Sequence, residues 1–179
     1  MKQPFRLDLE GIKQKARQHL SAGAVTENYR ADREAVIKVL NDVLATEIVC
    51  TLRYRNNALV AQGIHAEALV AEFTEHATQE QDHADKIAAR IVQLGGEPNM
   101  DPATLTQRSH AEYTTSRNLR QLIQENLIAE RVAIDTYGEI ARWLGDDDPT
   151  TRRLIEWILG QEEEHADDLS NLLEGAKAD

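Results

Sequence analysis

The sequence predicts an all-α protein, a four-helix bundle of up-down-down-up topology with a long connection between the second and third helices. Three observations support this prediction. Residues that favour helices are abundant, whereas the 179 residues include only four prolines and 4% aromatic residues. Apolar residues recur at helical spacing in four stretches, and a short pattern of glutamate and histidine occurs twice. The chain is long enough to bury one substantial core.

The first two bundle helices are expected at residues 31–62 and 65–94. In the first stretch Gly63 interrupts the helical pattern after these apolar positions: Val36, Ile37, Leu40, Val43, Leu44 and Ile48. The second stretch has its own apolar series: Leu69, Phe73, Ile87, Ile91 and Leu94. Gly95-Gly96 and Pro98 then end the second helix, since these residues favour helix termination.

A long crossover is expected to separate the two halves of the bundle. Residues 95–114 include Pro98 and Pro102 and are too many for a direct connection between antiparallel neighbours. The third helix is expected to end at Leu144, before Gly145. Its start is marked by three capping candidates: Thr114, Thr115 and Ser116.

The fourth helix and the N-terminal segment complete the expected organisation. Asp148-Pro149 provides an N-cap and a first-turn proline for a helix that continues to about Leu173. Residues 1–30 are polar, with one short helix expected at 8–20, and form an arm. The bundle domain is expected to span residues 31–175.

The charge of the chain is unevenly distributed. The formal net charge is −11, and residues 1–20 contain five Lys or Arg against two acidic residues, or +3, which leaves −14 for the rest. An acidic body attracts cations and disfavours broad nucleic-acid binding. The sequence has no apolar run long enough for a membrane span and no signal-peptide pattern, so a cytoplasmic protein is expected. A single cysteine, Cys50, cannot form an intrachain disulfide.

The duplicated pattern is Glu, followed 33 or 32 residues later by Glu-x-x-His. It comprises two sets of three residues: Glu47, Glu80 and His83, then Glu130, Glu162 and His165. Residues three apart share a helix face, so each Glu-x-x-His can present two ligands to one ion. Glu80 and Glu162 are suited to bridge two ions, while Glu47 and Glu130 each close one end. Oxygen and imidazole ligands without thiolate favour iron or manganese, and zinc is an alternative.

Several nearby residues have two interpretations. Glu163 and Glu164 fall outside the i to i+3 match and are expected to be solvated. Tyr54 and Tyr137 each lie seven residues after a pattern glutamate, on the same helix face. They are either hydrogen-bond partners or electron donors near the metals, or core residues with satisfied hydroxyls.

The remaining candidate residues receive simpler interpretations. Four histidines lack partners at ligand spacing and are expected on the surface: His19, His65, His76 and His110. Trp143 and Trp157 are interpreted as core or subunit-contact aromatics. Cys50 shares a helix face with Glu47 and is interpreted as a small packing residue.

With these motifs in place, residues 33–174 resemble the ferritin-like superfamily, and most closely the bacterioferritins. Beyond the duplicated pattern, the resemblance rests on Glu47 with Tyr54, and on a second-helix series: His83-Ala84-Asp85-Lys86, Ile91, Leu94 and Glu97-Pro98-Asn99. It implies that the six pattern residues bind two iron ions per subunit. Such proteins oxidise Fe(II) with dioxygen or hydrogen peroxide and store the Fe(III) product as a mineral inside a hollow shell.

Two departures from bacterioferritin refine the expectation. The methionine that binds haem in bacterioferritins is replaced by Gln81, so haem is not expected. Only 14 residues follow His165, which leaves no room for the fifth helix of 24-subunit ferritins. With the N-terminal arm, this resembles the twelve-subunit Dps-like mini-ferritins that have a bacterioferritin-type site. A homo-oligomer, most simply a dodecamer, is expected.

Two other functions are retained as alternatives. One is a rubrerythrin-like di-iron peroxidase or oxidase without mineral storage, although no rubredoxin-like cysteine cluster is present. The other is a protective shell that associates with DNA through basic residues of the arm. These residues are Lys2, Arg6, Lys13, Lys15 and Arg17.

Overall fold

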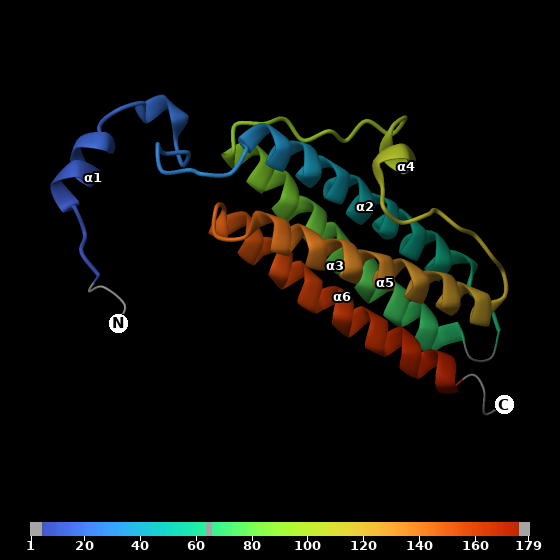
Figure 1. Cartoon of the computed structure of the whole chain (residues 1–179). Helices are drawn as coiled ribbons and strands as arrows, with labels where there is room; N and C mark the ends of the chain where they lie inside the picture. The colour runs from blue at the N-terminus through green and yellow to red at the C-terminus, as the bar shows by residue number, and fades with distance from the viewer. Residues whose placement is uncertain (1–4, 64–65, 176–179) are drawn as a thin grey trace.

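The computed structural model describes residues 5–63 and 66–175. Within these residues the chain forms helices and no strand, which confirms the predicted all-α class. Figure 1 shows four long helices side by side: α2 (Arg33–Val60), α3 (Ala66–Gln93), α5 (Leu119–Leu144) and α6 (Pro149–Gly175). The shorter elements are α1 (Leu9–Lys15), a 3-10 helix (Leu20–Ala22) and α4 (Leu105–Arg108). No helix of the described residues has the length and apolar character needed to cross a membrane.

Two apolar clusters show how the long helices are oriented. One cluster joins residues from the start of α2, the end of α3, the end of α5 and the start of α6: Val36, Ile91, Leu144 and Ile155. The second cluster joins the opposite ends of the same helices: Tyr54, Leu69, Leu122 and Leu169. Therefore α3 and α5 run in one direction and α2 and α6 in the other, the predicted up-down-down-up topology. The connection that contains α4 runs along α2 to reach the start of α5 (Figure 1).

Side-chain caps fix the starts of α2, α5 and α6. Asp32 accepts a hydrogen bond from the Ala35 amide at 3.1 Å, and Asp148 accepts one from the Thr151 amide at 2.9 Å. Asp148 was predicted as a cap, and the structure confirms it. A side-chain acceptor at this position satisfies an amide that has no partner within the helix.

The predicted start of the third helix was wrong by several residues. Asn118, rather than Thr114, Thr115 or Ser116, caps α5 by accepting a hydrogen bond from the Gln121 amide at 3.0 Å. Ser116 instead accepts from the Asn118 amide at 3.0 Å and so forms the turn that precedes the helix.

The second helix ends as predicted. The last residue of α3 is Gln93, and Gly95 follows with φ of 81°, a left-handed conformation that favours glycine. The amide of Gly96 bonds to the carbonyl of Ile91 at 2.9 Å and closes the helix end. The predicted first residue, His65, lies outside the described residues.

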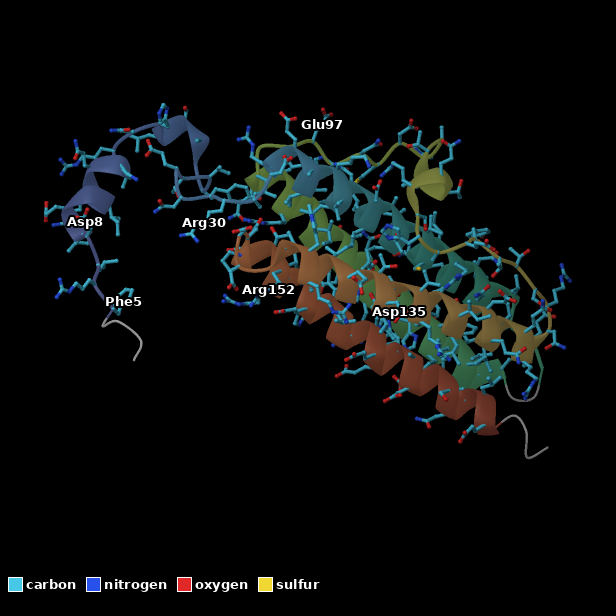
Figure 2. The ribbon with its side chains drawn as sticks, viewed as in Figure 1. Phe5, Asp8, Arg30, Glu97, Asp135 and Arg152 are labelled. Carbon is cyan, nitrogen blue, oxygen red and sulfur yellow. The ribbon has the colours of Figure 1, made fainter. Side chains whose placement is uncertain are left out.

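The N-terminal segment extends away from the bundle before it joins α2 (Figures 1 and 2). Its helix, α1, is shorter than the predicted helix at 8–20 and begins after Asp8, which caps the Gly11 amide at 3.0 Å. Nearer the bundle, Val25 and Tyr29 pack against the apolar core. The Tyr29 hydroxyl donates to Asp148 at 2.9 Å and ties the end of this segment to the start of α6.

Between the two apolar clusters, the centre of the bundle contains ionisable side chains. Six of them are at most 2% exposed: Glu47, Glu80, His83, Glu130, Glu162 and His165. Burying a charged group costs several kcal/mol unless another charge or a bound ion compensates for it. So many ionisable groups in the core of a bundle therefore indicate a functional site rather than packing.

Candidate metal centre

All four long helices contribute to the central cluster. Glu47 comes from α2 and Glu130 from α5, while α3 and α6 each provide a glutamate and a histidine one turn apart. The i to i+3 spacing places both side chains of each pair on the inner helix face. The structure thus brings together all six residues of the duplicated pattern. By contrast, Glu163 and Glu164 are exposed.

The donor atoms form two overlapping groups of metal-ligand type. In each group the atoms lie within 4.8 Å of one another. The first group is Glu47, Glu80, His83 and Glu162. The second group is Glu80, Glu130, Glu162 and His165. Glu80 and Glu162 belong to both groups, as expected for carboxylates that bridge two adjacent cations.

The two imidazoles face the shared glutamates in the same way. Nδ1 of His83 lies 3.2 Å from Glu162 and 3.8 Å from Glu80, and also 3.3 Å from Glu47. Nδ1 of His165 lies 3.1 Å from Glu162 and 3.6 Å from Glu80. Each histidine therefore presents the same ring nitrogen to the space between the carboxylates.

The carboxylates strongly raise the pKa of both histidines. Burial by itself lowers the pKa of His83, but the surrounding Glu162, Glu47 and Glu80 outweigh it and raise the pKa to about 12. Burial is likewise outweighed at His165, where Glu162 and Glu80 raise the pKa to about 10. Both imidazoles thus hold a proton that a metal ion would displace.

Burial raises, rather than lowers, the pKa of Glu47 and Glu130, the glutamates at the two ends of the cluster. Burial, with the charge of Glu80, raises the pKa of Glu47 to about 8. Burial and the charges of Glu80 and Glu162 raise the pKa of Glu130 well above its ordinary value. Burial also acts to raise the pKa of Glu80, but hydrogen bonds from His165 and His83 bring it below the ordinary value. The cluster therefore contains both ionised and protonated carboxyl groups.

Two carboxylate oxygens indicate what the cluster is built to hold. Oε1 of Glu80 and Oε1 of Glu162 are buried, and no described residue donates a hydrogen bond of good geometry to either atom, although Nδ1 of His165 and Nδ1 of His83 lie 3.6 Å and 3.2 Å away. A buried oxygen with no donor costs free energy, whereas coordination to a cation would satisfy it. Four carboxylates, two imidazoles and no thiolate suit a pair of iron or manganese ions. The residues present therefore fit a dinuclear centre.

A comparison with known protein families agrees with this site. The family model of the ferritin-like domain matches residues 37–178, which is most of the chain. The chain belongs to the ferritin-like family. The resemblance inferred from the duplicated pattern is confirmed.

Curated relatives of this ferritin-like chain are bacterioferritins and DNA-protection proteins. The bacterioferritin of Desulfovibrio desulfuricans is 29% identical over 138 residues, which cover 76% of this chain and 73% of the relative. The DNA protection during starvation protein of Pyrococcus furiosus is 27% identical over 154 residues, 84% of this chain and 83% of the relative.

Solved structures similar to this chain also include bacterioferritin-related proteins. The bacterioferritin-related protein of Bacteroides fragilis, described as a dodecameric thioferritin, is 34% identical with a TM-score of 0.79. The match covers 83% of this chain and 90% of that protein. The bacterioferritin of Desulfovibrio desulfuricans, described for its diiron site, is 25% identical with a TM-score of 0.73, covering 87% and 86% of the two chains.

The two tyrosines of this ferritin-like bundle contact the central cluster in an exchanged arrangement. The hydroxyl of Tyr54 on α2 donates to Glu130 on α5, although Glu47 is the pattern glutamate on the helix of Tyr54. Tyr137 on α5 correspondingly donates to Glu47 on α2. Both hydroxyls are therefore hydrogen-bond partners of pattern glutamates, which is one of the interpretations offered by the sequence. Burial raises the pKa of both tyrosines, so each remains a donor.

We expect Tyr137→Phe to weaken Mn(II) binding at the cluster about tenfold, because partners that orient a metal ligand typically contribute 10–100-fold to affinity. Free Mn(II) measured by electron paramagnetic resonance would give the binding constant. Tyr29→Phe is a matched control, since it removes a hydroxyl bond to Asp148 rather than to the cluster. Equal effects of the two substitutions would contradict an orienting role for Tyr137.

The position of one histidine differs from the prediction. His76 was expected on the surface, yet it is 1% exposed and its ring stacks on His165 with 4.1 Å between centroids. Burial, together with His165, lowers its pKa to about 4. A signal was available, because residues 69, 73, 76, 80 and 83 follow one helix face at alternating steps of four and three. Of the other three histidines, His19 is exposed, His110 is half-buried and His65 lies outside the described residues.

The tryptophans and the cysteine complete the surroundings. Trp143 and Trp157 are 52% and 42% exposed, so the interpretation as core residues was wrong; a subunit contact stays a prediction. Trp157 also meets His83 edge to face, with 5.4 Å between ring centroids. Cys50 is buried and packs with Ala111 and Ala129. This packing is consistent with the role expected for a small core residue.

Proposed function

We propose that this protein is a ferroxidase that stores or detoxifies iron. The observation that carries the proposal is the pair of four-residue ligand groups that share Glu80 and Glu162. In this proposal each subunit binds two Fe(II) ions. Glu47 and His83 bind one ion, and Glu130 and His165 bind the other. Fe(II) is the substrate, and its Fe(III) product is stored in a homo-oligomeric shell.

The proposed reaction balances with either oxidant. Two Fe(II) ions lose one electron each, and the two electrons with two protons reduce hydrogen peroxide to two molecules of water. With dioxygen, the same two electrons and two protons yield hydrogen peroxide. The side chains position both ions next to one another, and the hydroxyls of Tyr54 and Tyr137 orient the terminal glutamates.

Charge and family relationships support the remaining parts of the proposal. The acidic body, −14 outside residues 1–20, raises the local concentration of Fe(II). The bacterioferritin-related protein of Bacteroides fragilis is described as dodecameric. We therefore extend the proposal to a dodecameric shell.

Repeated additions of Fe(II) and hydrogen peroxide to the assembled protein would test the storage function. We expect consumption of one peroxide for every two Fe(II) ions, and retention of many more than two irons per subunit after several cycles. Iron per subunit, measured on the desalted assembly, gives the answer. Retention that stops at the bound ions while peroxide consumption continues would favour a rubrerythrin-like peroxidase or oxidase.

Association with DNA is a second candidate function. It is favoured by relatives named as DNA-binding, including the nutrient stress-induced DNA-binding protein of a Nostoc species, 29% identical over 143 residues. Four basic residues of the arm are exposed: Arg6, Lys13, Lys15 and Arg17. If the arm binds DNA, gel retardation should weaken steeply with salt and disappear after deletion of residues 1–20. Retention of binding by the deleted protein would exclude the arm.

A further inference from the structure

A second group of potential metal ligands lies next to the dinuclear centre. It consists of Glu72 and His76 on α3 and Asp168 on α6, none of which belongs to the duplicated pattern. Nε2 of His76 lies 3.2 Å from Glu72 Oε1 and 3.8 Å from Asp168 Oδ2. One potential donor atom from each residue lies within 4.8 Å of the others.

The spacing of these atoms suits a bound cation. Divalent metals bind imidazole nitrogen and carboxylate oxygen at about 2.1 Å, which places neighbouring donor atoms about 3 Å apart. The separation of His76 from Glu72 is close to this value, and that of His76 from Asp168 is only slightly longer. One imidazole and two carboxylates are also the mixed set that iron and manganese accept.

The burial of His76 makes this group more than a patch of surface acids. His76 is 1% exposed, and its Nδ1 has no hydrogen-bond partner among the described residues. Its Nε2 faces Glu72 and Asp168, whose side chains are 29% and 53% exposed. The exposure of the three side chains therefore decreases from Asp168 through Glu72 to His76, from the solvent toward the interior.

A groove connects this group to solvent. It has a volume of about 1100 Å³ and lies between α3, α5 and α6, with Glu72 and Asp168 in its lining. The charged lining residues are Glu67, Glu72 and Asp168 against Arg120. Within the described residues, no Lys or Arg forms an ion pair with Glu72 or Asp168. The groove thus has excess negative charge, which attracts cations.

The inner end of the group touches the dinuclear centre. The ring of His76 stacks on that of His165, whose Nδ1 faces Glu80 and Glu162. An ion bound by His76 would therefore be separated from the central cluster by the stacked imidazoles of His76 and His165.

We propose that Glu72, His76 and Asp168 form a third divalent-cation site, which takes up Fe(II) from the groove and supplies the dinuclear centre. The identity of the ion rests on the proposed ferroxidase function. The site itself rests on the converging donor atoms and the buried imidazole.

The location of the site can be tested with Mn(II), which resists oxidation by dioxygen. Anomalous scattering from crystals of the whole assembly soaked in Mn(II) should show three peaks per subunit, one of them between Glu72, His76 and Asp168. The double variant Glu72→Gln with Asp168→Asn should lose this peak alone. Peaks at the six central residues with none at His76 in the wild-type protein would overturn the third site. A peak at His76 with none at the six residues would instead overturn the dinuclear centre.

The role of the site in iron delivery can be measured by kinetics. The double variant should raise the Fe(II) concentration for half-maximal oxidation about tenfold, equivalent to about 1.4 kcal/mol, and leave the rate at saturating Fe(II) unchanged. A matched control is Glu163→Gln with Asp167→Asn, which removes the same charges from exposed positions of α6. Equal shifts in the two double variants would show an effect of overall charge and overturn the proposed delivery role. Native mass of each variant verifies that the assembly is intact.

Discussion

Glu162→Ala is expected to lower the initial rate of Fe(II) oxidation by at least about 100-fold while the shell still assembles. Glu162 belongs to both ligand groups, so its loss removes a donor from each ion position at once. Residues that only orient a ligand contribute 10–100-fold, so removal of a shared ligand should reach or exceed the upper value. Stopped-flow absorbance of the Fe(III) product gives the rate, and native mass spectrometry gives the assembly.

Glu163→Ala is the matched control, because Glu163 is the next residue of the same helix and is exposed. Its rate of oxidation should remain within twofold of wild type, whereas Glu80→Ala should match the loss seen for Glu162→Ala. Wild-type rates in both Glu80→Ala and Glu162→Ala would contradict the dinuclear assignment. A large loss in Glu163→Ala would mean that the wrong glutamate of α6 was chosen.

The convergence of the six central residues could be predicted because it depends on periodicity alone. A glutamate and a histidine three residues apart share a helix face, and the second copy of the pattern requires a second pair of helices. Buried carboxylates without compensation are costly, so four helices that turn these faces toward each other are expected to do so around bound cations. The bundle topology could also be predicted, because the 95–114 connection is long enough to cross the bundle and is too long for a direct turn between antiparallel neighbours.

Features that depend on which helices face each other were not predictable in this way. The exchange of the Tyr54 and Tyr137 partners arises because α2 and α5 face each other across the cluster. The periodicity of α3 indicates that His76 faces inward, but its contacts with His165 and Asp168, about 90 residues further along the chain, depend on how α3 and α6 pack. The start of α5 was missed because several residues near it can cap a helix, and only the backbone path selects Asn118.

Binding of divalent metal ions should release protons and become tighter as the pH rises. Four groups of the cluster have a raised pKa: His83 to about 12, His165 to about 10, Glu47 to about 8, and Glu130 well above its ordinary value. His83, His165 and Glu47 each hold a proton at pH 7, because these three pKa values lie above that pH, and the pKa of Glu130 is shifted in the same direction. Metal ligands must be deprotonated, so bound cations displace these protons.

The charge balance of this exchange explains why it is favourable in a buried site. Each displaced proton offsets one positive charge of the incoming cations, so the release of at least three protons cancels most of the charge that two divalent cations add to the buried cluster. A buried site whose net charge changes little avoids most of the free-energy cost of adding ions to a low-dielectric interior. Proton release on this scale is therefore the expected consequence of the geometry.

Calorimetric titration with Zn(II) in buffers of different ionisation enthalpy would count the protons. At pH 7 we expect at least about three per subunit from the dinuclear centre, released by His83, His165 and Glu47, since ligands bind metal only when deprotonated. The apparent affinity should rise from pH 6 to pH 7 and increase less steeply above pH 8, where Glu47 loses its proton without metal. Glu163→Ala should behave as wild type. An affinity for Zn(II) that stays constant between pH 6 and pH 8 would contradict the proton-loaded cluster, because a cation cannot displace protons without this dependence.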